Sequence, residues 1–204
     1  MGLSPSWPWL SGILIPPTAP RQPGHSDFAA LAELLKIPVR RDIFVSYHHS
    51  GDQAYYDALA RLCGDCKFLY DGSVDRRIDS EDAEYQERRI REEYITGTSA
   101  TVVLCGYQTF ERKFVDWEIC ATLNKEHGLI GLRLPLAQTT TPGAVIVPGR
   151  LHDNIVSGYA LWQSWGELTS AQNPAAVLRG WIETAIAREK RLIRNQLEKK
   201  ARNG

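Results

Sequence analysis

Hydrophobic and polar positions along the middle of the chain predict short strands that alternate with helices. Residues 42–47, 67–70 and 129–134 are short β-rich runs. The clearest strand is 100–105, Ala-Thr-Val-Val-Leu-Cys, which is apolar almost throughout. A strand that is buried on both faces of a sheet has this character. The apolar run at 145–147 predicts one more short strand.

Helical periodicity fills the stretches between these runs. Residues 52–62 carry apolar side chains at helical spacing. Residues 113–125, after the clearest strand, are also predicted to be helical. Residues 80–96 are strongly charged, with Glu and Arg four positions apart. The pair Asn-Pro at 173–174 is typical of a helix start and predicts a long last helix. Its final turns, at 188–202, are dense in charge, and we expect them to protrude or fray.

Alternating strands and helices predict an α/β fold, with a parallel sheet covered by helices on both faces. In such sheets ligands bind at the carboxyl ends of the strands, near the point where the strand order reverses. Three polar loops follow predicted strands and are therefore the candidate ligand-binding loops: 47–52, 71–80 and 106–114.

The 204 residues divide into three parts by composition. Residues 1–38 hold seven of the eleven prolines and are interpreted as a Pro-rich leader with one short helix at 27–36. The leader has no basic start, and its apolar run is interrupted, so a secretory signal is not expected. Residues 39–170 are the predicted α/β domain, and residues 171–204 the long C-terminal helix.

Composition excludes several classes of protein. Lys and Arg total 24, as do Asp and Glu, so bulk charge does not draw the chain to nucleic acid or to an anionic membrane. The chain has no run of about 18 apolar residues that could span a membrane. A hydrophobic content of 43% is enough for a folded core. Four cysteines are too few for a disulfide scaffold, so we expect a reducing, cytoplasmic setting.

Glu118 is the first candidate for chemistry. It lies in a mostly apolar helix start and shares a helical face with Phe114, Ala121 and Thr122. A carboxylate on an apolar face is costly unless it is paired or used. The alternatives to a functional role are a buried ion pair with an arginine of another helix, or an ordinary surface glutamate.

Two histidines and two cysteines are the other candidates. His48 and His49 directly follow a strand, where they could bind metal or transfer protons, but adjacent extended residues point opposite ways. They are better explained as polar loop residues. Cys63 and Cys66 form a C-x-x-C that ends a helix, unlike a thioredoxin-type redox site, and are interpreted as buried or incidental thiols. The cysteines and histidines have no zinc-like spacing, so no metal is expected.

Absent motifs narrow the choice further. The sequence contains no G-x-G-x-x-G, no Walker A and no G-x-S-x-G, which argues against a Rossmann dehydrogenase, a P-loop NTPase and an α/β-hydrolase. Trp162 and Trp165 predict an apolar anchor, better explained by core packing than by ligand stacking.

Three segments resemble Toll/interleukin-1 receptor (TIR) domains. Residues 42–47, Asp-Ile-Phe-Val-Ser-Tyr, resemble the opening strand, and 98–107 resemble the third strand and the loop after it. Residues 112–118 then resemble the aromatic-x-x-x-Glu motif, with Phe114 as the aromatic residue and Glu118 as the acid. The order and spacing are most similar to the bacterial branch that includes the Thoeris anti-phage TIR proteins.

The resemblance implies a flavodoxin-like fold that cleaves NAD⁺, as substrate and with no cofactor, at the bond between nicotinamide and ribose. It implies that Glu118 is the catalytic carboxylate. It also implies a substrate pocket lined by Ser46, Tyr47, His48, His49, Asp71, Phe114 and Trp117. The product would be ADP-ribose or a cyclic ADP-ribose-like signal. The implied partners are further copies of the chain on activation, a nucleotide-sensing effector and a phage-derived trigger.

Two other interpretations stay open at this point. A non-catalytic TIR adaptor would act by self-association, and its function would not depend on Glu118. A flavodoxin- or receiver-like binding module is the third. A receiver needs acids clustered at the end of the first strand, whereas Asp42 lies at its start.

Overall fold

The computed structural model describes residues 41–62, 67–69, 95–140 and 143–202, and for 67–69 the backbone. The chain divides into two units, Met1–Val39 and Arg40–Gly204, and all described residues belong to the second. The helix expected at 27–36, the charged helix up to residue 94, the C-x-x-C pair and Asp71 lie outside the described residues.

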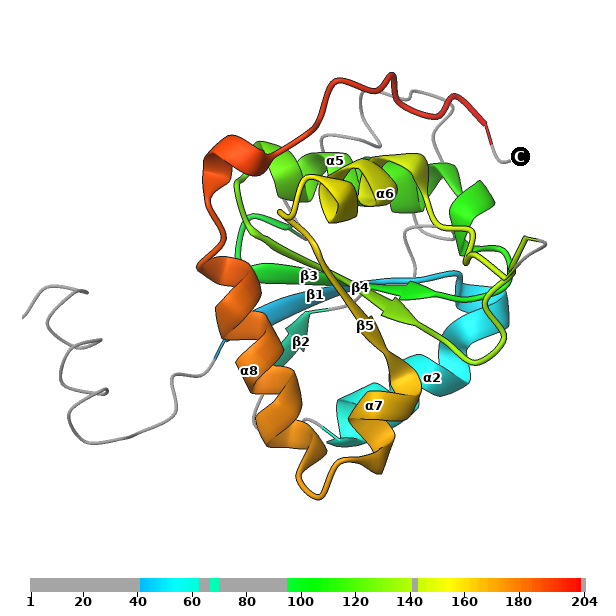
Figure 1. Ribbon diagram of the computed structural model, residues 1–204, viewed down its shortest axis with the longest axis vertical. Helices are drawn as coiled ribbons and strands as arrows, with labels where there is room; N and C mark the ends of the chain where they lie inside the picture. The colour runs from blue at the N-terminus through cyan, green and yellow to red at the C-terminus, as the bar shows by residue number, and fades with distance from the viewer. Residues whose placement is uncertain (1–40, 63–66, 70–94, 141–142, 203–204) are drawn as a thin grey trace, which may run out of the picture. The chain divides into compact units, whose positions relative to one another are not determined.

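Five strands within the described residues form one parallel sheet in the order β2-β1-β3-β4-β5 (Figure 1). They are β1 (Asp42–Ser46), β2 (Lys67–Leu69), β3 (Ala100–Cys105), β4 (Gly128–Arg133) and β5 (Leu161–Ser164). The order reverses between β1 and β3, as in flavodoxin-like proteins. The predicted α/β class is therefore confirmed.

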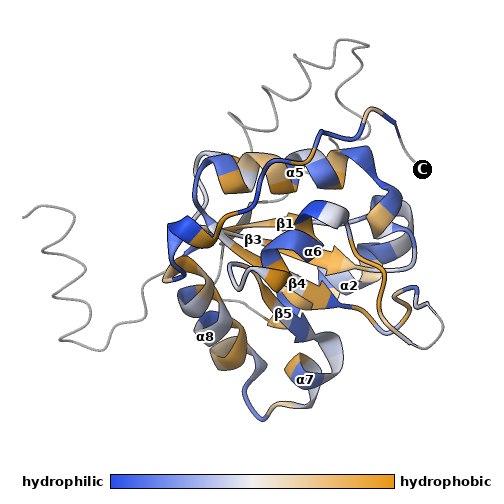
Figure 2. Cartoon of the chain, turned by 45° about the horizontal axis from the view of Figure 1, so that its top comes forward, coloured by the Kyte–Doolittle hydropathy of each residue, from blue (hydrophilic) through white to orange (hydrophobic). Residues whose placement is uncertain are grey.

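β3 is the central strand, and its position explains its composition. It pairs with β1 on one side and with β4 on the other, and all six of its residues are buried. Since helices cover both faces, neither set of alternating side chains can be polar without a partner. Figure 2 shows the resulting concentration of hydrophobic residues over β1, β3 and β4.

Helices cover the two faces of the sheet unequally (Figure 1). One face packs against α5 (Lys113–Asn124) and α6 (Gly149–Val156). The other packs against α2 (His49–Leu62), α7 (Trp165–Ser170) and α8 (Pro174–Ile186). Two short 3₁₀ helices complete the described elements: η2 (Thr109–Glu111) and η3 (Lys190–Leu192).

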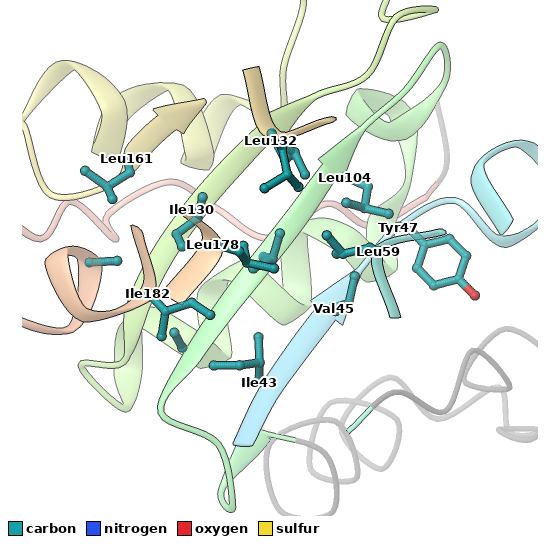
Figure 3. Packing of buried hydrophobic residues seen from close by; sticks show 14 of the residues in the cluster. Ile43, Val45, Tyr47, Leu59, Leu104, Ile130, Leu132, Leu161, Leu178 and Ile182 are labelled. Atoms are coloured by element: carbon teal, nitrogen blue, oxygen red, sulfur yellow. The ribbon is translucent and has the colours of Figure 1, made fainter. Parts of the chain in front are cut away.

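The larger core cluster lies on the α2, α7 and α8 face (Figure 3). The cluster contains Ile43 and Val45 of β1, Leu59 of α2, Ile130 of β4 and Ile182 of α8. Each fully buried aliphatic side chain of this kind contributes roughly 1.5–3 kcal/mol of hydrophobic free energy.

The strand predicted at 145–147 is wrong, and the fifth strand lies at Leu161–Ser164 instead. Val145 makes only an isolated antiparallel bridge with Thr139. In β5, Trp162 packs so closely across Gly131 that a Cβ on that glycine would lie 2.7 Å from the indole ring. Trp162 is thus part of the core packing, as predicted, and glycine at 131 makes room for it.

The last helix starts as predicted but is much shorter. The side chain of Asn173 accepts a hydrogen bond from the N–H of Ala176 at 3.0 Å, which caps the first turn of α8. The helix ends at Ile186, where its buried apolar stripe ends. The prediction of a long helix over 171–204 is therefore wrong. The chain leaves the helix, and Leu192 and Ile193 pack instead against the cluster on the α5 and α6 face.

The chain beyond η3 does not protrude or fray, contrary to the prediction. Residues 193–202, which we term the C-terminal segment, run across α5 and α6 (Figure 1). Buried polar side chains of these two helices bind its backbone, a tertiary interaction that no local periodicity reveals.

None of the helices in the described ranges combines the length and the apolar character that a membrane crossing requires.

Candidate functional site

The strand order reverses between β1 and β3, so the carboxyl ends of these two strands mark the candidate site. Ser46 ends β1 and pairs in register with Val103 of β3. Beyond this point, residues 47–49 lead into α2, and residues 106–109 lead into η2. Two of the three predicted ligand-binding loops therefore start side by side, while the third, 71–80, lies outside the described residues.

Ser46 and Tyr47 project to opposite faces of the sheet, as adjacent strand residues do. Ser46 is fully buried, and its hydroxyl has no hydrogen-bond partner within the described residues. The Tyr47 hydroxyl donates to Oε1 of Gln53 at 2.7 Å, and its ring stacks on Tyr56 of α2, with 5.0 Å between ring centroids. In Figure 3 this hydroxyl points away from the apolar cluster. The α2 side thus holds Tyr47 firmly.

His48 shapes the start of α2. Its carbonyl oxygen accepts hydrogen bonds from the N–H groups of Gly51 and Asp52, at 3.1 and 2.8 Å. Its ring Nε2 lies 2.7 Å from the Ser50 hydroxyl. The neighbouring His49 has a buried Nδ1 with no partner in the described part of the chain. Of the two histidines, His49 therefore carries the unused polar atom.

A buried carboxylate that the sequence did not reveal ties the two loops together. Asp52 is only 5% exposed, and its Oδ2 lies 3.1 Å from the Thr109 hydroxyl of η2. The same hydroxyl lies 3.0 Å from the carbonyl oxygen of Leu104 and accepts from the N–H of Gly106 at 2.9 Å. Thr109 thus links α2, the end of β3 and η2.

Gly106 is the residue that makes this arrangement fit. A Cβ at position 106 would lie 2.0 Å from Oδ1 of Asp52, far inside van der Waals contact. Burial raises the pKa of the Asp52 carboxyl, while hydrogen bonds from Thr109 and the His48 backbone act in the opposite direction. A glycine directly after an apolar strand was the signal in the sequence that another chain segment approaches here.

Cys105 offers no reactive thiol at this edge. Burial, with a smaller contribution from the charge of Asp52, raises the pKa of its thiol well above the usual range. The thiolate is therefore disfavoured, and it is the thiolate that acts as a nucleophile.

Glu118 lies on the other face of the sheet, on α5, and is 4% exposed. The level of Glu118 along the strands follows from a contact of Thr122, one helical turn later on α5. The hydroxyls of Thr122 and Thr101 of β3 lie 2.7 Å apart. Moving four residues back along α5 covers about 6 Å toward the carboxyl edge. Moving two residues along β3, from Thr101 to Val103, covers about 6.6 Å. Glu118 is therefore level with Val103 and with its register partner Ser46.

The two predicted aromatic residues pack together beside Glu118. The rings of Phe114 and Trp117 meet edge to face, with 5.6 Å between centroids, and Trp117 joins a buried cluster with Phe44 and Ile95. The ammonium of Lys113 lies 4.8 Å from the Phe114 ring centroid. Trp117 is 5% exposed, so it contributes mainly to the core.

The predicted site residues thus fall into two groups. Ser46 and Glu118 share one face at one level, with Phe114 and Trp117 on the same helix as Glu118. Tyr47, His48 and His49 belong to the α2 side, where Asp52, which was not predicted, also lies. In the described residues, His, Cys, Asp and Glu side chains form no group of three that could hold a metal ion.

Comparison with protein families gives one match. Residues 44–139 match the model of the TIR-like domain of the Thoeris protein ThsB. This part of the chain is a Thoeris-type TIR-like domain. The resemblance seen in the sequence is thereby confirmed, and the chain carries a TIR domain of anti-phage defence. No curated protein matches the chain.

The matched span of the TIR-like domain starts within β1 and ends beyond β4. It contains both faces of the candidate site, with Ser46, Asp52 and Glu118. The strand β5, the helices α6 to α8 and the C-terminal segment lie outside it.

Proposed function

We propose that this TIR-like domain cleaves NAD⁺ at the nicotinamide–ribose bond, with Glu118 as the catalytic carboxylate. The observation that carries the proposal is a buried carboxylate on α5, only 4% exposed, at the level of the Ser46 hydroxyl, which has no hydrogen-bond partner within the described residues. Both residues belong to the span that matches the Thoeris family. Ligands of flavodoxin-like sheets bind at the switch point of the strand order, which is where both residues lie.

The chemistry requires little beyond one carboxylate. As the bond from C1′ of the ribose to nicotinamide breaks, its electron pair goes to the pyridine nitrogen, and neutral nicotinamide leaves. The ribose is left with oxocarbenium character, which the negative charge of Glu118 stabilises. Attack by water, with loss of one proton, gives ADP-ribose. Attack by a nucleophilic atom of the same molecule gives a cyclic ADP-ribose-like product.

Other side chains supply binding in this proposal. The Ser46 hydroxyl and the His49 Nδ1, which have no partner among the residues that the structure describes, suit hydrogen bonds to ribose hydroxyls. Tyr47 and His48 would shape the pocket from the α2 side, and Asp71, Phe114 and Trp117 would complete it. NAD⁺ is the substrate, and no cofactor is needed.

The proposed setting follows from the family. The product would signal to a nucleotide-sensing effector after a phage-derived trigger, with further copies of the chain assembling on activation. The free thiols of Cys105 and Cys120 support a reducing, cytoplasmic location.

The test is nicotinamide release from NAD⁺ by the purified protein over a range of protein concentrations. Wild type and the Glu118→Gln variant are compared, because glutamine keeps the shape and removes the charge. Glu167→Gln is the matched control, since Glu167 is an exposed carboxylate on α7, which covers the other face of the sheet. We expect release by wild type and by the control, and loss of at least about 100-fold in Glu118→Gln.

The alternative function is a non-catalytic module that acts by self-association. Two exposed apolar side chains favour it: Tyr107 after β3 is 59% exposed, and Leu136 after β4 is 69% exposed. Under this alternative, wild type and both variants release no nicotinamide, even in lysate from phage-infected cells. Release by wild type and Glu118→Gln alike would remove Glu118 from the mechanism.

A further inference from the structure

The C-terminal segment is bound to the helix that carries Glu118 by a buried polar network. Arg150 of α6 is 1% exposed and is the largest of the fully buried side chains in the described residues. Its Nε and Nη2 donate to the two carboxylate oxygens of Asp116 on α5, at 3.0 and 3.3 Å. A bidentate ion pair of this kind fixes direction as well as distance. Arg150 therefore sets the position of α5 relative to α6.

The same guanidinium also holds the C-terminal segment. Its Nη1 donates to Oδ1 of Asn195 at 2.6 Å, and its Nη2 donates to the carbonyl oxygen of Leu197 at 2.9 Å. Asn154 of α6 binds the backbone of Arg194 twice, once as donor and once as acceptor, at 2.7 and 3.0 Å. The segment is thus bound tightly to α6.

The segment in turn contacts α5 along its length. The N–H of Lys200 donates to Oδ2 of Asp116 at 3.0 Å, and the indole N–H of Trp117 donates to the carbonyl oxygen of Lys200 at 2.9 Å. Further along, the Asn195 amide donates to the carbonyl oxygen of Cys120 at 3.3 Å and to Oδ1 of Asn124 at 2.8 Å. Three turns of α5 are therefore held from one side.

That side of α5 is the one away from Glu118. At 100° per residue, Asp116 and Cys120 lie about 200° and 160° around the helix from Glu118. The segment therefore contacts the side of α5 that is opposite Glu118, while Glu118 lies on the side that faces Ser46. Because a misplacement of about 1 Å lowers reaction rates steeply, the position of the helix matters for the proposed chemistry.

We infer that the C-terminal segment, through Asn195, Arg150 and Asp116, positions Glu118 for catalysis by fixing α5. This inference rests on the proposed NAD⁺ cleavage. The three side chains are positioning residues, because they act on Glu118 only through the helix.

The test uses the full chain with the substitution Asn195→Ala. This removes three hydrogen bonds between the C-terminal segment and the helices α5 and α6. Gln196→Ala is the matched control, because Gln196 is exposed and adjacent. The first measurement is hydrogen exchange of the Trp117 indole N–H by NMR, assigned with Trp117→Phe. The second is the steady-state kinetics of nicotinamide release.

We expect faster indole exchange and a kcat lowered about tenfold or more in Asn195→Ala, with little change in KM. Asn124→Ala removes one of the three bonds and should give a smaller effect in the same direction. The control should match wild type in both measurements.

Three outcomes would overturn the inference. Faster exchange with an unchanged kcat would show that the segment does not position Glu118, and a raised kcat would show that it restrains activity instead. Unchanged exchange would show that Asn195 does not hold the segment. Wild type that releases no nicotinamide would refute the proposed function itself, and indole exchange still reports the state of the segment in that case.

Discussion

Two buried aspartates, Asp116 and Asp52, lie in two regions of the molecule and are stabilised in different ways. Asp116 on the back of α5 faces the guanidinium of Arg150, so its negative charge has a buried cation as partner. Asp52 at the carboxyl edge has hydrogen bonds from Thr109 and the His48 backbone, and burial raises its pKa. Within the described residues no cation is among the causes that shift this pKa.

The two aspartates therefore differ in how far their burial is compensated by an opposite charge. The Asp116 region lies where helices pack, and its charges are compensated, which suits a permanent structural contact. The Asp52 region lies at the carboxyl edge of the sheet, where the strand order reverses. In the described part of the chain, the Ser46 hydroxyl at the end of β1 also has no hydrogen-bond partner. Uncompensated polar groups that gather at one sheet edge are typical of a functional site.

The largest effect is expected from Asp116→Asn, which leaves Arg150 buried without a counter-ion. We expect the free energy of unfolding to fall by about 3–5 kcal/mol. Glu183→Gln is the control, because it breaks the half-exposed pair of Glu183 with Arg41, worth about 0–1 kcal/mol. Urea unfolding of the two variants measures both values, and equal losses would contradict the contrast between buried and exposed pairs.

Gly106→Ala tests the close approach of Asp52 to the end of β3. Because the added Cβ would lie 2.0 Å from Oδ1, we expect a loss at or above about 3 kcal/mol, the upper end for overpacking. A Cβ on Gly166 of α7 would meet no atom within 4 Å, so Gly166→Ala should be neutral or slightly stabilising. Thermal unfolding of the pair checks this, and a tolerated Gly106→Ala would mean that Asp52 can move aside.

Thr109→Val tests the hydroxyl that links the two loops. The substitution keeps the volume but leaves the Asp52 carboxylate and the N–H of Gly106 each with one bond fewer. We expect a loss of about 1–3 kcal/mol, with most of it restored in Thr109→Ser, which keeps the hydroxyl. Denaturant midpoints measure this order, and the reverse order would show that the methyl group, not the hydroxyl, is what matters.

The smallest effect is a pH dependence. The pKa of Asp52 is raised above its usual 3.8 in the folded state, so the folded state favours the protonated form. Stability from Asp52 is therefore present at low pH and is lost as pH rises through the folded pKa. The amide that replaces the carboxyl in Asp52→Asn cannot ionise. The stability of wild type minus that of this variant should fall as pH rises above the usual value of 3.8 and level off above the folded pKa. A difference independent of pH would refute the raised pKa.

Much of the fold could be predicted because local patterns agreed with the tertiary environment. β3 and α5 were predicted almost to the residue, since a strand buried on both faces must be apolar throughout and α5 is a mostly apolar run too long for a strand. β5 was missed because its sequence, Leu-Trp-Gln-Ser, is short and only its first residue is buried. The apolar residues at 145–147 suggested a strand, but apolar character alone does not provide a pairing partner.

The candidate site was predictable only in part. The position of Glu118 followed from its spacing after the apolar strand and from the family resemblance. The roles of Asp52 and Asn195 could not be found in the same way, because their partners lie 57 and 45 residues away. Such long-range polar contacts leave no periodic trace in the sequence.

The attachment of the C-terminal segment has a consequence for sequence change. Most of its bonds to α5 and α6 use its own main-chain N–H and C=O groups, which every residue except proline supplies. The side chains of Gln196 and Glu198 face solvent. Substitutions at these two positions should drift freely during evolution, and a fluorophore could be attached there while the segment stays in place.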